Sequence, residues 1–569
     1  MKYVYILAFL MASILPIGAQ TTGVSLGNGI DYADALPSPK HEVRAVWLTT
    51  IGGLDWPRTT GATQQKQELT RMLEQMRRAG VNTILFQARV RATTLYNSAY
   101  EPWEGTPTGK PGSHPGYDPL QWAVSECHRL GMECHAWVVT IPVGKWNKIG
   151  CQQLRKSNAK LLRHIGEDGY MNPEQSATGD YLAKICREIV HNYDIDGIHL
   201  DYIRYPEQWP KARSSQETAQ RRRNITAIVR KIHQAVKQEK PWVKLSCSPI
   251  GKHDDLTRYR TGGWNARTAV AQDAQAWLRE GLMDQLYPMM YFQGNNFYPF
   301  AIDWQEQAAG RTVGGGLGIY FLDPREGKWT LREVERQMHM LRQLGMGHCY
   351  FRARFLTDNV KGIYDFVCRF DAVPALVPPM TWAGKPAPEA PAQLQQSGTL
   401  LYWTAARDNS GAPGLTYNLY ASEDYPVDIT QADNLIATRL TATQLLAPNT
   451  TGLYYAVTAT NRYGMESAAR QMPQPQGVVK RLKSTDRLSA TGSHPMAIVR
   501  GETLKVPACG AVSDAYILVV KTLTGQTVTR RYYTTELNVR NLPDGVYQLY
   551  SMDRRGRQHR LGFFSVKRK

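Results

Sequence analysis

"DGIHLDYIRYP", residues 196–206, is the stretch of sequence that decides the fold. Its first half alternates as a β-strand does, with Ile198 and Leu200 on one face and His199 and Asp201 on the other. An ionised carboxylate on a buried strand is unfavourable by several kcal/mol unless it is paired, hydrogen-bonded or neutralised. We therefore expect Asp201 to have a chemical role, on the face turned away from any helix that covers the strand.

Seven further apolar stretches accompany this strand, and segments with helical periodicity separate them. The eight predicted strands are residues 42–50, 81–90, 132–140, 195–203, 243–250, 283–291, 312–320 and 348–354. Leu69, Leu73 and Met76, ahead of Gly80, illustrate the helical spacing of the intervening segments. Eight strand–helix units predict an α/β fold, a (β/α)8 TIM-type barrel over residues 42–370. Active sites of such barrels lie at the C-terminal ends of the strands.

Two small all-β modules are predicted after the barrel. Residues 371–390 are rich in proline and predict a linker. Residues 391–472 contain alternating strands separated by turn-rich stretches, a pattern typical of a β-sandwich. A second linker, 473–489, leads to the module 490–569, which ends in GVYQLYSM and HRLGFFSVK, a predicted pair of strands.

The N-terminal residues predict export. Residues 1–19 combine a lysine, an apolar run of about 12 residues and a small-residue end at Gly18 and Ala19, the pattern of a cleaved signal peptide, and residues 20–41 form a leader. The run is shorter than the ~20 residues of a spanning helix, and no later stretch is long enough, so we expect no membrane span. The eight cysteines lack CxxC spacing and predict buried thiols, with a Cys127–Cys134 disulfide as the alternative.

The formal charge of +19 suits acidic partners, but charge alone does not separate nucleic acid, a membrane surface and an anionic polymer. Residues 479–569 hold 17 basic and 6 acidic side chains, a balance of +11, so more than half of the excess lies at the C-terminal end. Export argues against nucleic acid as a partner. The chain contains no P-loop, no GxGxxG after a strand and no nucleic-acid motif, so we expect no small-molecule cofactor.

Polar and aromatic side chains gather at the predicted strand ends. The alternation turns Gln87, Arg89 and Arg91 inward on one strand and His135 and Trp137 on the next. On a later strand the inward residues are Tyr287, Met289 and Tyr291. Aromatic rings stack on the C–H faces of sugars, and guanidinium and amide groups hydrogen-bond to hydroxyls, so this set predicts a sugar site. The structural alternative is a satisfied network inside the barrel, with Arg89 and Asp201 as a buried ion pair.

Several longer motifs make the interpretation specific. EVRAVWLTTIGGLDWP, NTILFQARVRATTLYNSAYEPW, GYDPLQWAVSECHRLGMECHAW, YDIDGIHLDYIRYP, CSPIG and DQLYPMMYF follow one another between residues 42 and 355. Together they resemble the glycosyl hydrolase-like 10 family. The resemblance implies an exported barrel enzyme that acts on glycosidic bonds, with bacterial cell-envelope glycan as a leading substrate class. The positions that match the family's motifs are Gln87, Arg89, Glu101, Trp103, His135, Trp137, His199, Asp201, Ser248, Pro249 and Tyr291.

Two departures from the family pattern concern the chemistry. Many members read D-D-Y where this chain has Asp201, Tyr202 and Ile203, so a second carboxylate is missing, and Met289 replaces a common glutamine. Glycoside hydrolysis ordinarily needs two carboxyl groups.

We expect Asp201 to be the ionised partner, with Arg89 or His199 holding its pKa low. Candidates for the acid are Glu101, which leads because it lies in a matched motif, and then Glu207, Asp254 and Asp255. The predicted substrate-binding residues are Gln87, Arg89, His135, Trp137, His199, Tyr202, Arg204 and Tyr291.

Two other functions stay open at this point. A metal-dependent hydrolase would use His135, His199 and Asp201 as ligands, although no HxH or HExxH motif supports it. A glycan-binding protein would retain the barrel without the acid.

The two β modules carry resemblances of their own. Trp403, the strand around Tyr417 to Tyr420, and Tyr455 resemble a fibronectin type III module. The C-terminal module resembles the sorting domain of the type IX secretion system, which would make the secretion machinery a partner.

Overall fold

The computed structural model describes residues 38–446 and 453–473, and then six shorter segments: 497–499, 503–506, 515–522, 526–532, 536–553 and 558–566. The predicted signal peptide, most of the leader and most of the second linker lie outside the described residues.

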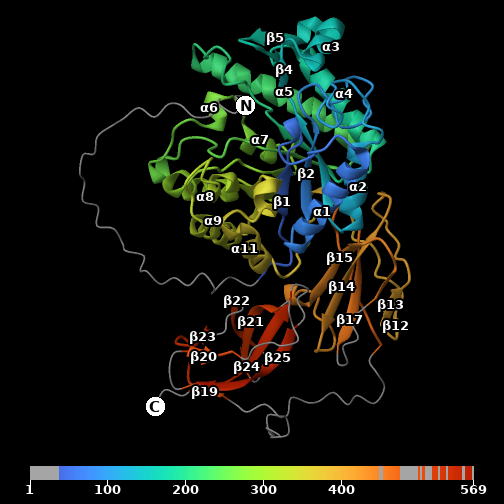
Figure 1. The fold of residues 1–569 in the computed structure, drawn as a ribbon, viewed down its shortest axis with the longest axis vertical. Helices are drawn as coiled ribbons and strands as arrows, with labels where there is room; N and C mark the ends of the chain where they lie inside the picture. The colour runs from blue at the N-terminus through green and yellow to red at the C-terminus, as the bar shows by residue number, and fades with distance from the viewer. Residues whose placement is uncertain are drawn as a thin grey trace, which may run out of the picture.

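Eight parallel strands close into a barrel in the order β1-β2-β3-β7-β8-β9-β10-β11, so the predicted TIM-type fold is confirmed (Figure 1). The strands are β1 (Arg44–Leu48), β2 (Thr83–Arg89), β3 (Glu133–Val139), β7 (Gly197–Asp201), β8 (Lys244–Cys247), β9 (Gln285–Leu286), β10 (Thr312–Leu317) and β11 (Gly347–Phe351). All eight overlap the predicted stretches. Strand β9 is much shorter than residues 283–291, because Pro288 has no N–H to donate to a neighbouring strand.

Helices cover the outside of the barrel. They are α1 (Ala62–Arg78), α2 (Pro119–Arg129), α4 (Ser176–Asn192), α5 (Ser215–Glu239), α6 (Ala266–Ala269), α7 (Ala274–Arg279), α8 (Tyr298–Glu306), α9 (Leu331–Gln343), α10 (Ala353–Thr357) and α11 (Ile363–Phe370). Ile198 and Leu200 are fully buried between β7 and this helix layer. The alternation read from the sequence therefore holds for β7, and His199 and Asp201 belong to the interior side.

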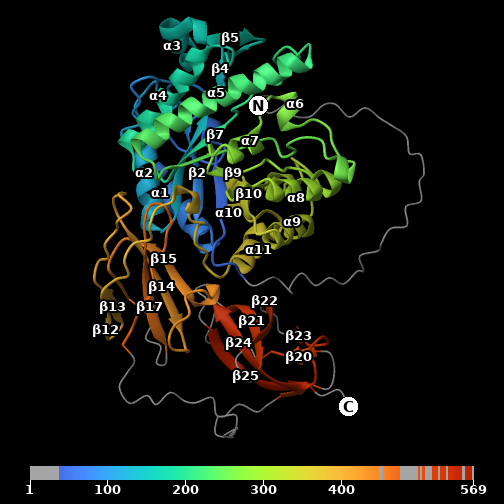
Figure 2. The ribbon, with the colours of Figure 1, turned by 180° about the vertical axis from the view of Figure 1, so that it is seen from behind.

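An insertion follows β3 at the C-terminal end of the barrel and was not predicted. It consists of helix α3 (Ile149–Asn158) and an antiparallel sheet of β4 (Pro142–Lys145), β6 (Asp168–Met171) and β5 (Leu162–Ile165). Both ribbon views place it at one end of the molecule, opposite the β modules (Figures 1 and 2). It therefore stands on the end of the barrel where an active site is expected.

The first β module packs two sheets around one core. One sheet is β12 (Leu394–Ser397), β13 (Leu400–Trp403) and β16 (Gln444–Leu446). The other is β15 (Leu435–Leu440), β14 (Thr416–Ser422), β17 (Tyr454–Thr460) and β18 (Arg470–Gln471). Trp403, Tyr417 and Tyr455 are buried together between them, as the alternating pattern predicts for a sandwich.

The C-terminal module is also all-β. Its five-stranded sheet contains β19 (Ala497–Val499), β25 (Gln558–Val566), β24 (Gly545–Asp553), β21 (Ala515–Thr522) and β22 (Thr527–Tyr532), and a smaller sheet pairs β20 (Thr503–Lys505) with β23 (Glu536–Asn538). The predicted terminal strand pair is confirmed, since β24 and β25 are antiparallel neighbours.

The proline-rich segment 371–390 has little regular structure, but it is packed rather than free. Val373 is fully buried and its carbonyl accepts a hydrogen bond from Arg44 Nη1 at 2.8 Å. Trp382 Nε1 donates to Asp284 Oδ1 at 2.9 Å. The segment therefore closes the N-terminal end of the barrel and carries the next module against it.

Arginines of the first β module reach carboxylates at this N-terminal end. Arg439 Nη2 lies 2.8 Å from Asp196 Oδ1, and its Nη1 lies 3.3 Å from Glu133 Oε1. Both carboxylates are nearly fully buried, with side chains 5% and 4% exposed. Arg462 makes a second contact, 2.9 Å from the exposed carboxylate of Asp194. The module is thus joined to the barrel through charges rather than through a wholly apolar surface.

Replacement of Arg439 by alanine is expected to lower the free energy of unfolding by about 2 kcal/mol, because two buried carboxylates each lose one charged partner and keep another, Lys244 beside Glu133 and His128 beside Asp196. Arg230→Ala is the control. Its partner Glu280 is 45% exposed, so the loss is expected to be about 1 kcal/mol or less. Urea unfolding of both variants measures the difference, and equal losses would contradict this description of the interface.

Two further predictions concern the cysteines and membrane-spanning helices. Cys127 and Cys134 are both buried free thiols, so the alternative of a disulfide between them is wrong. Within the described residues, no helix has the length and apolarity that crossing a membrane requires.

Candidate active site

Asp201 is the last residue of β7 and lies at the C-terminal mouth of the barrel. Its Oδ1 accepts hydrogen bonds from Ser248 Oγ and from the Tyr202 backbone N–H, both at 2.8 Å. Its Oδ2 accepts one from Trp137 Nε1 at 3.2 Å. None of these partners is a cation, so the carboxyl group is oriented by neutral donors.

The pKa of Asp201 is raised from the ordinary value for aspartate. Burial is the largest cause, because the charged form loses its hydration. The hydrogen bond from Ser248, the charge of Arg204 and the donors of Tyr202 and Trp137 oppose it without overcoming it. The expectation that a neighbouring cation holds this pKa low is therefore wrong, and Asp201 is suited to carry a proton.

This raised pKa predicts how stability depends on pH. Between the ordinary aspartate pKa of 3.8 and the raised value, the folded protein binds the Asp201 proton and the unfolded chain releases it. As pH rises through that window, the free energy of unfolding of the wild type therefore falls relative to that of Asp201→Asn. Below the window, the difference in free energy of unfolding between the two proteins does not change with pH. Urea unfolding of both proteins from pH 3 upward measures this trend; a difference that changes in the opposite direction would contradict it.

Aromatic rings line the barrel around Asp201. Trp137 is buried and donates to the carboxylate, and Tyr287 lies deeper in the same interior cluster. Tyr291 stacks on Phe351 with ring centroids 5.3 Å apart, and both rings contact Trp47 edge-on.

Trp47 and Phe351 were not among the residues predicted for the site. Trp47 lies on the same face of the first predicted strand as Val43 and Ala45, and all three belong to the interior cluster. The alternation of that strand would therefore have identified Trp47 as an inward residue.

His199 and His135 are brought inside the barrel, but they form interior hydrogen bonds rather than contacts with Asp201. Trp47 Nε1 donates to His199 Nε2 at 3.0 Å, so the ring proton is on Nδ1, 3.0 Å from Ser246 Oγ. Burial, with a smaller effect of nearby His135, holds the pKa of His199 well below its usual range. His135 Nε2 lies 3.0 Å from Glu133 Oε2, toward the N-terminal end.

These contacts oppose the metal-dependent alternative, because both ring nitrogens of His199 are already bonded. Among the described residues, the one side-chain group spaced to hold a metal ion is Glu42, His348 and Asp371. It lies at the opposite end of the barrel, where Arg342 and Arg44 neutralise both of its carboxylates.

Arg89 and Glu101 form a buried ion pair away from Asp201. Arg89 Nε and Nη2 donate to the two oxygens of Glu101, both at 2.7 Å, and Tyr181 of helix α4 donates to the same carboxylate at 3.1 Å. The pairing of β2 with β3 shifts between Gln87 and Arg89, so the simple alternation fails there and Arg89 turns toward the helix layer.

This geometry corrects the leading assignment of the acid, because both oxygens of Glu101 are occupied by a guanidinium. Arg89 also donates to the carbonyls of Val139 and Thr140, and thereby fixes the end of β3. Gln87 has a similar supporting role, since its Oε1 accepts from the backbone N–H groups of Thr50 and Ile51 at 2.9 Å. The prediction that Arg89 and Gln87 bind substrate is not supported by these contacts.

Tyr202, Arg204 and Glu207 form the wall next to Asp201. The Arg204 guanidinium lies 4.6 Å from the centre of the Tyr202 ring, and its Nη2 donates to Glu207 Oε1 at 2.8 Å. Two other nitrogens of Arg204 and the Tyr291 hydroxyl are buried and have no hydrogen-bond partner among the residues that the structure describes. Unpaired buried donors are costly unless a ligand completes them, so Arg204 and Tyr291 are the predicted binding residues with the strongest geometric support.

The remaining acid candidates differ in their surroundings. Asp254 is paired with Arg267 at 2.7 Å. Asp255 accepts from the Gly263 N–H at 3.0 Å and holds a loop. Glu207 is 40% exposed and is linked to Asp201 through Arg204. Glu207 is also paired with an arginine, but this arginine, Arg204, acts through its charge on Asp201 as well, so Glu207 is the acid candidate of this set that shares a partner with Asp201.

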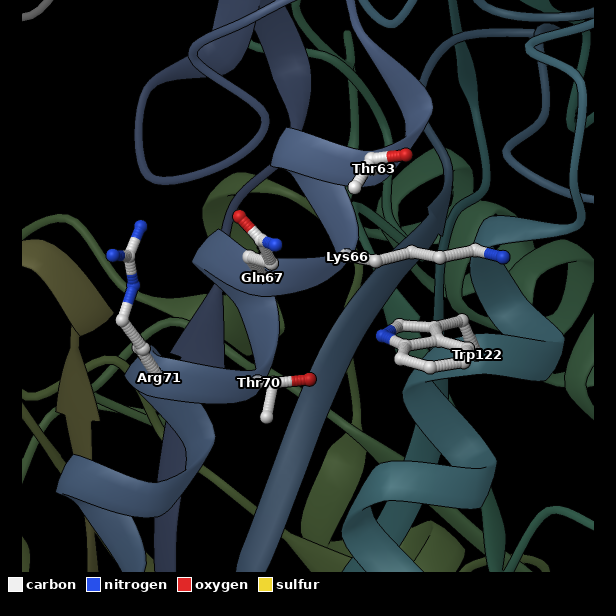
Figure 3. A pocket seen from close by; sticks show the side chains of 6 residues that line it. All are labelled: Thr63, Lys66, Gln67, Thr70, Arg71 and Trp122. Carbon is white, nitrogen blue, oxygen red and sulfur yellow. The ribbon is translucent and has the colours of Figure 1, made fainter.

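A separate groove of about 440 Å3 lies on the outer surface between α1 and α2. The Lys66 side chain lies over the Trp122 ring there (Figure 3), and its Nζ is 4.8 Å from the ring centroid. The lining residues include no carboxylate and come from the helix layer, so this groove offers no acid–base chemistry.

Comparison with known proteins shows the family of this chain. Residues 42–314 match the model of the family described as glycosyl hydrolase-like 10. Glycosyl hydrolase YngK of Bacillus subtilis is 30% identical over 388 residues, which span 62% of this chain and 76% of that protein. This chain belongs to the glycosyl hydrolase-like 10 family.

Other relatives agree with the assignment. Glycosyl hydrolase DigH of Escherichia coli is 30% identical over 290 residues, 44% of this chain and 65% of DigH. Among solved structures, the glycoside hydrolase domain of PgaB (BpsB) from Bordetella bronchiseptica aligns with a TM-score of 0.40 at 12% identity, over 58% of this chain and 98% of that domain. The match to the family model and the identity to YngK confirm, for the barrel, the resemblance read from the motifs.

Proposed function

We propose that this protein is an exported glycoside hydrolase that cleaves glycosidic bonds of a bacterial cell-envelope or other complex glycan. The observation that carries the proposal is Asp201, a buried carboxyl group held by Ser248 and Trp137 at the mouth of the barrel. Its raised pKa is what a general acid requires, because the group must still hold a proton when substrate binds. Membership of the family and the aromatic lining of the mouth support the same chemistry.

In the proposed reaction Asp201 donates its proton to the glycosidic oxygen while the bond from that oxygen to the anomeric carbon breaks. Glu207 is the second carboxylate and takes a proton from the water that supplies the new hydroxyl, so atoms and charges balance. Arg204 and Tyr291 donate hydrogen bonds to sugar hydroxyls, and the rings of Trp137 and Tyr202 contact the sugar faces.

The other parts of the chain are proposed to serve export and placement. The leader pattern of residues 1–19 supports export, although it lies outside the described residues. The sandwich of three and four strands supports a fibronectin type III-like spacer. The C-terminal sheet module, with its excess of basic residues, is proposed as a sorting or attachment domain.

The test is incubation of the wild type and Asp201→Asn with cell-wall glycan strands and a panel of plant and microbial polysaccharides, with and without a chelator. Mass spectrometry reads the released oligosaccharides. Release by the wild type alone, unaffected by the chelator, supports the proposal and identifies the substrate from the product masses. Binding of a glycan by both proteins without release would instead favour the glycan-binding alternative.

A further inference from the structure

The loop that follows β8 presents an exposed tryptophan at the active-site end of the barrel. Trp264 is 49% exposed, and no hydrogen bond or ring contact of its side chain is found among the described residues. The loop begins at Ser248, which holds Asp201, and ends at helix α6, which lies on the same half of the molecule as the insertion in both ribbon views (Figures 1 and 2). The ring therefore lies on the same rim as the proposed site but does not belong to its buried core.

The loop is fixed on both sides of Trp264. Asp255 Oδ1 accepts from the Gly263 N–H at 3.0 Å, and Lys252 Nζ donates to the Gly262 carbonyl at 3.1 Å. On the other side, Asn265 is 3% exposed and its side chain accepts from the Thr268 N–H at 2.8 Å. Hydrogen bonds on both sides of Trp264 thus fix the loop that presents this large apolar ring to solvent. The exposure of the ring is therefore not a result of a loosely held loop.

Exposed amides lie beside this loop. Thr261 Oγ1 donates to the Asn295 carbonyl at 3.2 Å, and Lys252 Nζ donates to Asn296 Oδ1 at 2.6 Å. These contacts join the β8 loop to residues 293–296 of the β9 loop, where Gln293, Asn295 and Asn296 are exposed. An aromatic face with neighbouring amides is the combination that binds a sugar ring, through its C–H face and its hydroxyls.

We propose that Trp264 and the amides of the β9 loop form a second glycan subsite, which holds a sugar unit of the substrate chain beyond the units that contact Asp201. This inference rests on the proposed function for its substrate, but it concerns binding and does not require cleavage. It predicts that affinity increases with chain length until the chain reaches Trp264.

The test measures binding in the Asp201→Asn background, so that no chain is cleaved. Retardation in gels that contain long cell-wall glycan strands is compared for Trp264→Ala and for Tyr402→Ala, a control that removes a 39% exposed aromatic ring from the first β module. We expect Trp264→Ala to weaken binding about 10-fold, as loss of one aromatic stacking contact does, with no change for Tyr402→Ala. Trp264→Phe is expected to restore most of the affinity, and the loss is expected to shrink with di- and tetrasaccharide fragments.

The outcomes separate this inference from the proposed function. Unchanged binding by Trp264→Ala, or a loss of equal size for disaccharide and long strands, would overturn the subsite even if the wild type cleaves glycan. Absence of cleavage together with Trp264-dependent binding would overturn the proposed hydrolase and leave the subsite standing. Failure of the Asp201→Asn protein to bind the cell-wall strands or any polysaccharide of the panel would overturn both.

Discussion

Asp201→Asn is expected to cleave natural glycan about 1000-fold more slowly than the wild type, within the range that general acid–base catalysis contributes. The amide side chain has nearly the shape of the carboxyl group but no proton to give the leaving oxygen. The loss is expected in kcat, because the donated proton matters in the transition state and contributes little to substrate binding. The rate of appearance of reducing ends, measured with purified glycan strands, checks this result.

The leaving group provides a sharper test of the role of Asp201. A nitrophenyl glycoside releases a weakly basic phenolate that needs little protonation, so Asp201→Asn should lose far less activity on it than on the glycan strands. Asp254→Asn is the matched control, since Asp254 is paired with Arg267 and should retain wild-type rates. Equal losses on both kinds of substrate would mean that Asp201 does not act as the acid.

Ser248→Ala tests what orients and tunes this group. The Ser248 hydroxyl donates to Asp201 at 2.8 Å and stabilises the ionised form, so its removal should raise the pKa of Asp201 further. The limb of the pH–rate profile on which activity falls as Asp201 ionises is expected to move to higher pH. A shift to lower pH, or no shift, would contradict the assignment.

The barrel could be predicted from the sequence because the periodicity that identifies each strand and helix lies within a short stretch of the chain. The period of two in DGIHLD and the period of 3.6 around Leu69 and Met76 reflect burial on one face of each element, and that burial follows from the fold itself. The insertion of β4 to β6 was missed for the opposite reason. Its strands have four residues each, and they pair with one another rather than with a long buried neighbour, so they carry little periodicity.

The site was predictable in composition but not in geometry. Asp201 and Trp137 lie together at the mouth because strict alternation holds along β7 and β3, whereas Tyr291 lies beyond the end of β9 and still packs into the barrel interior. Arg89 does not join them, because one shift in the register of β2 against β3 turns it to the helix side, and alternation rules contain no such shift. The low pKa expected for Asp201 depended on Arg89 or His199: the register shift removes Arg89, and His199 is buried, bonded to Trp47 and Ser246, and has a lowered pKa.

Glu101→Gln is expected to lower the free energy of unfolding by about 3 kcal/mol and to leave the turnover of the folded enzyme largely intact. The substitution removes the charge that balances Arg89, a guanidinium buried at 0% exposure beside the helix layer, and an unpaired buried charge is strongly unfavourable. If Glu101 were the catalytic acid, the same variant would instead be stable and inactive. Urea unfolding together with kcat per folded molecule separates the two cases.

A double-mutant cycle completes this argument. Arg89→Met alone leaves the Glu101 carboxylate buried without its cation, and a loss of similar size is expected. The double variant Arg89→Met/Glu101→Gln leaves no unpaired charge, so its stability should exceed the value obtained by adding the two single losses by about 2 kcal/mol. Arg230→Ala is the control, because its partner Glu280 lies 2.8 Å away on the exposed surface and such pairs contribute less than about 1 kcal/mol. Additive losses in the cycle would mean that Arg89 and Glu101 do not stabilise each other and do not together fix the end of β3. Glu101 would then again be a candidate for the catalytic acid.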